Sequence, residues 1–188
     1  KNTEPAARNQ EKKPAEKTPE ANPAEEEKPA APKPGTDKDK EEFDVSEVPP
    51  VVTHHQITLD GKVLKYTATT GRLPLKRGDG KIEGEMFFVA YTLDGQDAEK
   101  RPLTFAFNGG PGSATVWLHM GALGPRRVGL RPDGLLPPAP YHIADNPHTL
   151  LDKSDLVLVD AMSTGFSRAA NAELSKKFLG VKGDIDAF

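Results

Sequence analysis

The first 42 residues of the chain contain no side chain from which a hydrophobic core could be built. They are almost entirely Pro, Ala, Glu, Lys, Asp, Asn and Thr, and they include no Leu, Ile, Val or aromatic residue. Such a segment buries too little apolar surface to offset the entropy that the chain loses on folding. We therefore predict a disordered, extended spacer over residues 1–42, with a specific docking segment as the alternative, and a folded part over residues 43–188.

The composition excludes several classes of function. Positive and negative side chains are interspersed and give a formal net charge of −3, so we predict no basic patch for nucleic acid. The chain has no cysteine, which excludes disulfides, cysteine-ligated zinc and a cysteine nucleophile. No apolar run reaches the length of a membrane span. The oligomeric state cannot be read from the sequence.

Five segments have the apolar or alternating pattern of β-strands: residues 55–59, 62–67, 84–93, 103–107 and 156–159. Asp60 and Gly61 separate the first two segments and form the favoured two-residue hairpin turn. The last two segments are short and continuously apolar, as expected of strands that are covered on both faces.

A helix is predicted over residues 113–123, because Val116, Met120 and Leu123 fall on one face. Gly124 and the proline after it end this helix, and residues 131–146 are rich in Pro and Gly and are predicted to form a loop. Antiparallel strands followed by strand, helix, strand and helix predict an α/β fold with a mixed sheet. In such folds the functional loops follow the carboxyl ends of strands, here after Phe107 and after Val159.

Both ends of the chain suggest that it belongs to a longer protein. The chain begins at Lys1 rather than Met, which fits a removed signal peptide and a secreted or periplasmic location. Residues 183–186 predict the start of a helix with Asp184 as its N-cap, only a few residues before the chain stops at Phe188. We therefore expect a fragment, in which strand 156–159 is left as an apolar sheet edge without its neighbour.

Residues 108–113 (NGGPGS) form a glycine-rich loop between a predicted strand and a predicted helix. Consecutive glycines allow a sharp turn and bring bare N–H groups close to a ligand, and the following helix adds the positive end of its dipole. An oxyanion hole in an α/β hydrolase is built in this way. A tight turn without a chemical role is the simpler alternative, and the spacing does not match a phosphate-binding loop.

This loop resembles the N-G-G-P-G stretch of the serine carboxypeptidase family. Further matches follow in the same order over about a third of the chain, and they fit the bacterial branch of the family best: residues 116–119 (VWLH), 123–127 (LGPRR), 146–147 (NP), Asp160 and 164–167 (TGFS). Together these motifs are a strong signal, whereas any one of them alone would be weak.

The resemblance implies an α/β-hydrolase fold and a serine-type carboxypeptidase that needs no metal or cofactor. It implies that Gly110 donates an oxyanion-hole N–H. It also implies that Asn108, with Gly109 beside it, binds the free C-terminal carboxylate of a peptide or protein substrate. An Asn amide can donate to a carboxylate without adding charge, which makes this role chemically reasonable.

The chain departs from the family at several positions. Ala122 stands where many relatives have a Glu near the carboxylate of the substrate, and Ser113 stands where eukaryotic members have Cys. Ala161 and Ser163 replace residues that are usually Pro and Gly. The missing Glu puts the carboxylate network of the family, and the acid-shifted pH preference that it implies, in doubt.

Residues 161–165 (AMSTG) come close to the G-x-S-x-G pattern of a nucleophile elbow. However, the hydrolase triad runs in the order Ser, acid, His, and all five histidines of the chain precede Ser163. The triad of the family would therefore lie outside this chain. We predict that Ser163 is a loop hydroxyl or occupies a glycine-like position, and that Asp160 braces the loop.

The predicted function is therefore release of C-terminal residues from peptides through an acyl-enzyme, with this chain carrying the oxyanion and carboxylate-recognition loop only. Alone, it is expected to be inactive. One alternative is an acyltransferase or another hydrolase of the same fold, although an aminopeptidase usually has His at the position of Asn108. The other is a non-catalytic peptide-binding module.

Overall fold

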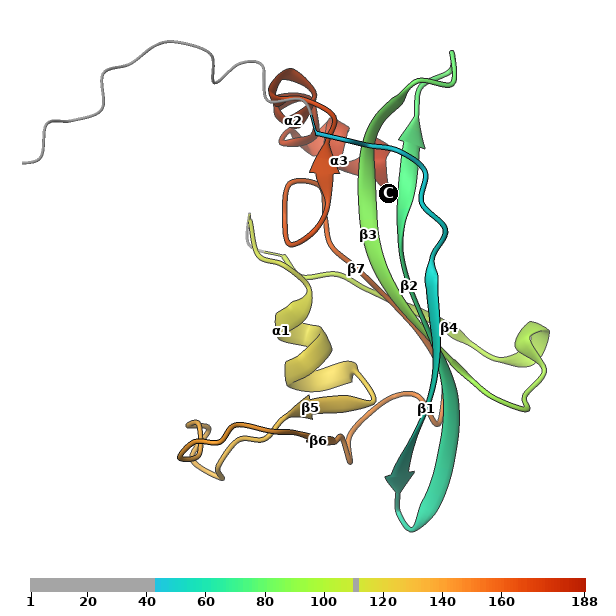
Figure 1. Cartoon of the computed structure of the whole chain (residues 1–188), viewed down its shortest axis with the longest axis vertical. Helices are drawn as coiled ribbons and strands as arrows, with labels where there is room; N and C mark the ends of the chain where they lie inside the picture. The colour runs from blue at the N-terminus through green and yellow to red at the C-terminus, as the bar shows by residue number, and fades with distance from the viewer. Residues whose placement is uncertain (1–42, 110–111) are drawn as a thin grey trace, which may run out of the picture. The chain divides into compact units, whose positions relative to one another are not determined.

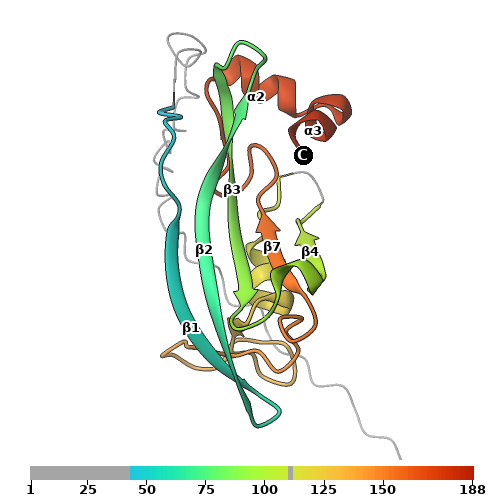
Figure 2. The same cartoon turned by 90° about the vertical axis from the view of Figure 1, so that its right-hand side faces the viewer.

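The computed structural model describes residues 43–109 and 112–188, and its main feature is a mixed β-sheet. Along the sheet the strands follow the order β1–β2–β3–β7–β4, which can be followed in Figure 1 and from the side in Figure 2. The strands are β1 (Val51–Leu59), β2 (Lys62–Lys76), β3 (Ile82–Leu93), β4 (Leu103–Ala106) and β7 (Asp155–Val159). The first three are antiparallel, β7 is antiparallel to β3, and β4 is parallel to β7.

The predicted hairpin is confirmed and is longer than its sequence pattern indicated. Asp60 and Gly61 take positive φ angles of 49° and 76°, as the turn between β1 and β2 requires. Only the far end of β1 is buried, where Ile57 packs with Tyr66 and Leu151 in one hydrophobic cluster. A second cluster, formed by Met86, Val159, Met162, Ala169, Phe178 and Ala187, lies where β3 and β7 meet the C-terminal helices.

The expectation that strand 103–107 is covered on both faces is wrong for the described residues. Leu103, Phe105 and Phe107 are 55%, 63% and 54% exposed. The expectation that residues 156–159 form the sheet edge is also wrong, because β7 lies between β3 and β4. After β3 the chain first forms β4, and it later returns to place β7 between β3 and β4, so that β4 becomes the edge strand of the described sheet.

The predicted helix over residues 113–123 is present but begins later, as α1 (Val116–Leu118), and ends in a π-helical turn, η3 (His119–Leu123). Gly124 ends it as predicted, with an extended backbone. The loop predicted over residues 131–146 contains one short strand, β6 (Ile143–Asp145), which pairs with β5 (Arg126–Val128). A 3₁₀ turn, η2 (Ala98–Lys100), precedes β4.

The C-terminal residues form two short helices instead of the single late helix that the sequence predicted. They are α2 (Ala172–Phe178), which Asn171 caps, and α3 (Val181–Ala187), which begins after Gly180. Asp184 is therefore not an N-cap but lies in the first turn of α3. Gly183 lies within α3 rather than at its start, and a Cβ there would overlap the backbone of Lys177 where the two helices pack. The two-residue strand β8 (Arg168–Ala169) pairs with β3.

No helix within the described residues is long and apolar enough to cross a membrane.

Candidate functional site

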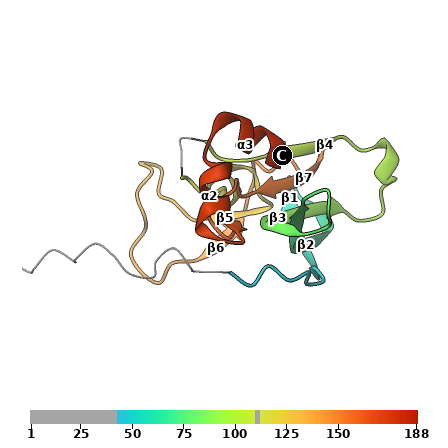
Figure 3. The ribbon, with the colours of Figure 1, turned by 90° about the horizontal axis from the view of Figure 1, so that it is seen from above.

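Two loops meet at the carboxyl ends of the adjacent parallel strands β4 and β7. Residues 108–115 follow β4 and residues 160–167 follow β7. In Figure 2 both strands point to the end of the sheet where α2 and α3 lie, and Figure 3 looks onto that end. Ligands of α/β proteins bind outside the carboxyl ends of strands, so the two loops predicted from the sequence lie at the appropriate edge.

Asp160 joins the two loops. Its carboxylate accepts the backbone N–H of Thr115 at 2.8 Å and, through its other oxygen, the backbone N–H of Phe166 at 3.0 Å. The side chain is buried, and each of its two carboxylate oxygens accepts a backbone N–H from a different loop. The predicted bracing role of Asp160 is confirmed, and it extends to the glycine-rich loop as well as to its own.

Ser167 fixes the far end of the second loop. Its hydroxyl donates to the backbone carbonyl of Asp160 at 2.7 Å and accepts the backbone N–H of Phe87 at 2.8 Å. The residue has no exposed surface. The loop after β7 is therefore closed on itself and is attached to β3.

Gly165 is required by the close approach of this loop to Asp160. Its φ angle is +47°, in the region that favours glycine, and a Cβ at this position would overlap the Asp160 carboxylate. The glycine therefore allows the turn and also leaves room for the carboxylate that bridges the loops.

Asn108 and Gly109 line a cleft of about 290 Å³ between the two loops and the C-terminal helices. Apolar side chains wall the side of the cleft toward the helices, and Asp184 lies among the lining residues. Asn108 is partly buried, and its amide nitrogen donates to the backbone carbonyl of Gly109 at 3.1 Å. Gly110, the predicted oxyanion donor, lies outside the described residues.

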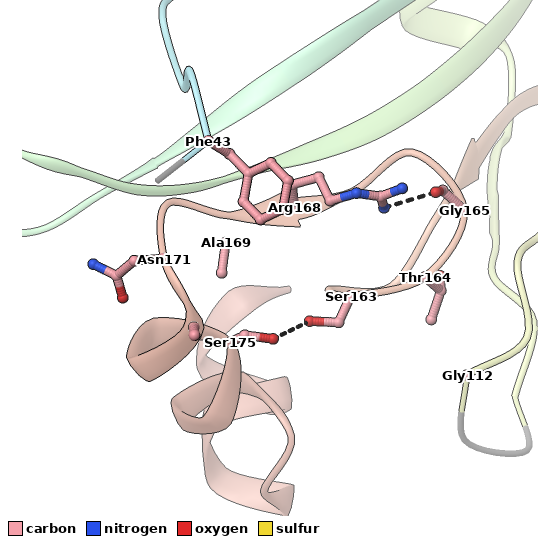
Figure 4. A pocket seen from close by; sticks show the side chains of 10 residues that line it. Phe43, Gly112, Ser163, Thr164, Gly165, Arg168, Ala169, Asn171 and Ser175 are labelled. Carbon is pink, nitrogen blue, oxygen red and sulfur yellow. Dashed lines mark hydrogen bonds between the residues drawn. The ribbon is translucent and has the colours of Figure 1, made fainter. Parts of the chain in front are cut away.

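Ser163 has a glycine-like conformation, which is one of the two alternatives that the sequence indicated for it. Its φ angle is +64°, and its hydroxyl lies 2.9 Å from the hydroxyl of Ser175 in α2. Figure 4 shows this pair across a pocket of about 490 Å³, with Arg168 bound to the carbonyl of Gly165 on the opposite side. None of the histidines shares a hydrogen bond with Ser163 in the described part of the chain.

His119 lines a separate apolar cavity of about 540 Å³ between α1 and the sheet. Its Nε2 lies 2.6 Å from the Tyr91 hydroxyl. Burial lowers the pKa of His119, and the nearby Asp160 partly opposes this effect. Burial also raises the pKa of Tyr91 to about 12. Both groups are therefore neutral at pH 7, and we assign them to packing.

Within residues 43–109 and 112–188, no three His, Asp or Glu side chains gather closely enough to hold a metal ion. Neither models of known protein families nor curated proteins match the chain.

Sequence reasoning missed Thr115, which is buried between the loops and bonded to both of them. A Thr two residues after a glycine-rich stretch gives no distinctive signal. Its role depends on β7 lying next to β4, which a local pattern does not reveal.

Proposed function

We propose that this chain carries the oxyanion and carboxylate-recognition loop of a serine-type carboxypeptidase with an α/β-hydrolase fold. The observation that carries the proposal is the junction at Asp160, whose carboxylate holds the glycine-rich loop and the T-G-F-S loop together. Both loops lie at the carboxyl ends of neighbouring parallel strands, where hydrolases of this fold place their catalytic groups.

In this proposal a peptide lies with its free C-terminal carboxylate against the amide nitrogen of Asn108 and its last peptide carbonyl against the N–H of Gly110. A serine attacks that carbonyl and expels the C-terminal residue, and water then hydrolyses the acyl-enzyme. The neutral Asn108 amide next to apolar walls supports this assignment, whereas the Asp184 carboxylate in the same cleft would repel a substrate carboxylate placed close to it. The proposal gives Ser163 no role as nucleophile, which is supported by the pairing of its hydroxyl with that of Ser175 and by the fact that no histidine hydrogen-bonds to it among the described residues.

The test is steady-state kinetics of the protein that contains this chain, on one peptide and on its C-terminal amide. Gly110→Ala disturbs the oxyanion loop and should lower kcat by about 10²-fold or more, because the lost interaction acts mainly in the transition state. Asn108→Ala should raise KM for the free acid and change it less for the amide. Ser163→Ala is the matched control and should keep kcat within a few-fold of wild type.

Two outcomes would contradict the proposal. A folded Ser163→Ala protein without activity would make residues 161–165 a nucleophile elbow. Binding of peptides without any hydrolysis would favour the alternative of a non-catalytic peptide-binding module.

A further inference from the structure

The hydroxyl of Thr115 connects the backbone of Asn108 to the end of β7. It accepts the N–H of Asn108 at 3.1 Å and donates to the backbone carbonyl of Val159. A threonine hydroxyl has only one proton, and that proton is directed at Val159, so the hydroxyl acts solely as an acceptor toward Asn108. Thr115 is 3% exposed, so water does not easily replace either bond.

Thr115 is itself held rigidly. Its own N–H donates to the Asp160 carboxylate at 2.8 Å, so both its backbone and its side chain are attached to the end of β7. Through these bonds the backbone of Asn108 is held in place relative to β7 as well as to β4, the strand that Asn108 follows.

Within residues 43–109 and 112–188, the Asn108 side chain makes no hydrogen bond to a residue outside its own loop. Its amide nitrogen bonds, as far as the described residues go, to the carbonyl of Gly109, which is exposed and has open space where a Cβ would be. The direction of the amide therefore follows the backbone at position 108, and the bond to Thr115 is the contact that fixes that backbone.

We infer that Thr115 is a positioning residue, which sets the place of Asn108 for recognition of the substrate carboxylate. The inference rests on the function proposed above and deepens it. It predicts that the Thr115 hydroxyl matters for the affinity of substrates with a free C-terminus, and that it has much less effect on substrates without one.

The test compares Thr115→Ala with Thr115→Ser, because these two variants differ only in the hydroxyl. KM and kcat are measured on a peptide acid and on the matched C-terminal amide. Thr115→Ala should raise KM for the acid by about fivefold or more, the usual effect of one lost hydrogen bond. Its effects on kcat and on KM for the amide should be smaller. Thr115→Ser should restore most of the affinity. Equal effects on acid and amide, or no difference between the two variants, would overturn the inference.

Hydrogen exchange of the Asn108 amide tests the positioning without relying on activity. The amide should be protected in the wild-type chain and should exchange at least about fivefold faster in Thr115→Ala than in Thr115→Ser. Fast exchange in the folded wild type would overturn the inference even if a variant failed to fold. If the wild type hydrolyses neither substrate, the proposed function fails, and the exchange result alone decides whether Thr115 positions Asn108.

Discussion

At the scale of single residues, the loop after β7 combines two left-handed backbone positions with a buried carboxylate. Ser163 has a φ angle of +64° and Gly165 one of +47°. An L-residue with a side chain pays about 1–2 kcal/mol for this conformation. The Ser163 side chain lines a pocket, so that the left-handed conformation leaves room for it. Gly165 instead lies directly against Asp160. The two positions therefore differ in what a side chain would meet.

We predict that Gly165→Ala destabilises the fold by about 3 kcal/mol or more, because the new methyl group displaces the Asp160 carboxylate and takes the acceptor away from the buried N–H of Thr115 and from the N–H of Phe166. Gly134→Ala is the matched control, since Gly134 also has a positive φ of 81° but has nothing within 4 Å of its Cβ position. The control should lose only about 1–2 kcal/mol of backbone strain. Urea unfolding measures both variants, and equal losses would contradict the role given to the Asp160 contact.

At the scale of elements, β4 combines the properties of an edge strand and an apolar strand. In the described sheet it pairs only with β7, and the outward-facing Phe105 is 63% exposed. Unpaired N–H and C=O groups beside exposed apolar side chains favour pairing with another chain. The sequence predicted that β7 would be the exposed edge. The structure places β4 there, and the argument that an exposed apolar edge favours association applies to β4 instead.

We predict that the chain self-associates through β4 and that Phe105→Lys shifts it toward the monomer. A charge on an exposed edge opposes pairing with a second strand, and it costs little stability at a position that is already exposed. Val63→Lys is the control, because Val63 is 57% exposed but lies in β2, an interior strand. Sedimentation velocity at several concentrations distinguishes the variants. A monomeric wild type, or an equal response to both lysines, would refute the prediction.

At the scale of the whole folded part, His119 of η3 packs against Tyr91 of β3 and so joins the helix to the sheet. The pKa of His119 is lowered by burial from its ordinary value of 6.5. The unfolded chain therefore binds a proton at this histidine before the folded chain does. By linkage, the contribution of neutral His119 to stability is complete above about pH 6.5 and is lost as the pH falls toward the lowered pKa.

We predict that the melting temperature falls between pH 7.5 and pH 5.5 and that His119→Gln reduces this fall by a few degrees, because Gln cannot be protonated in this range. His148→Gln is the matched control, since it makes the same replacement at an exposed histidine. Thermal unfolding followed by circular dichroism provides the measurement. The same pH dependence in His119→Gln and wild type would show that another group is responsible.

The sequence alone determined the local elements of the fold and the location of the candidate loops. The β1–β2 hairpin, β3, β7, the end of the helix at Gly124 and the bracing by Asp160 of its own loop all follow from turn chemistry, periodicity or a short motif. These features depend on residues close together in the chain, so a local pattern is sufficient to predict them.

Only the tertiary structure decided which strand is the edge, where the last two helices begin, and that Thr115 joins the two loops. Each of these features depends on segments far apart in the sequence. Residue 115 meets residues 159 and 160 only because β7 lies beside β4, and Gly183 serves helix packing only because α3 folds back on α2. Such contacts are set by the order of strands and the packing of helices, and no single stretch of sequence encodes them.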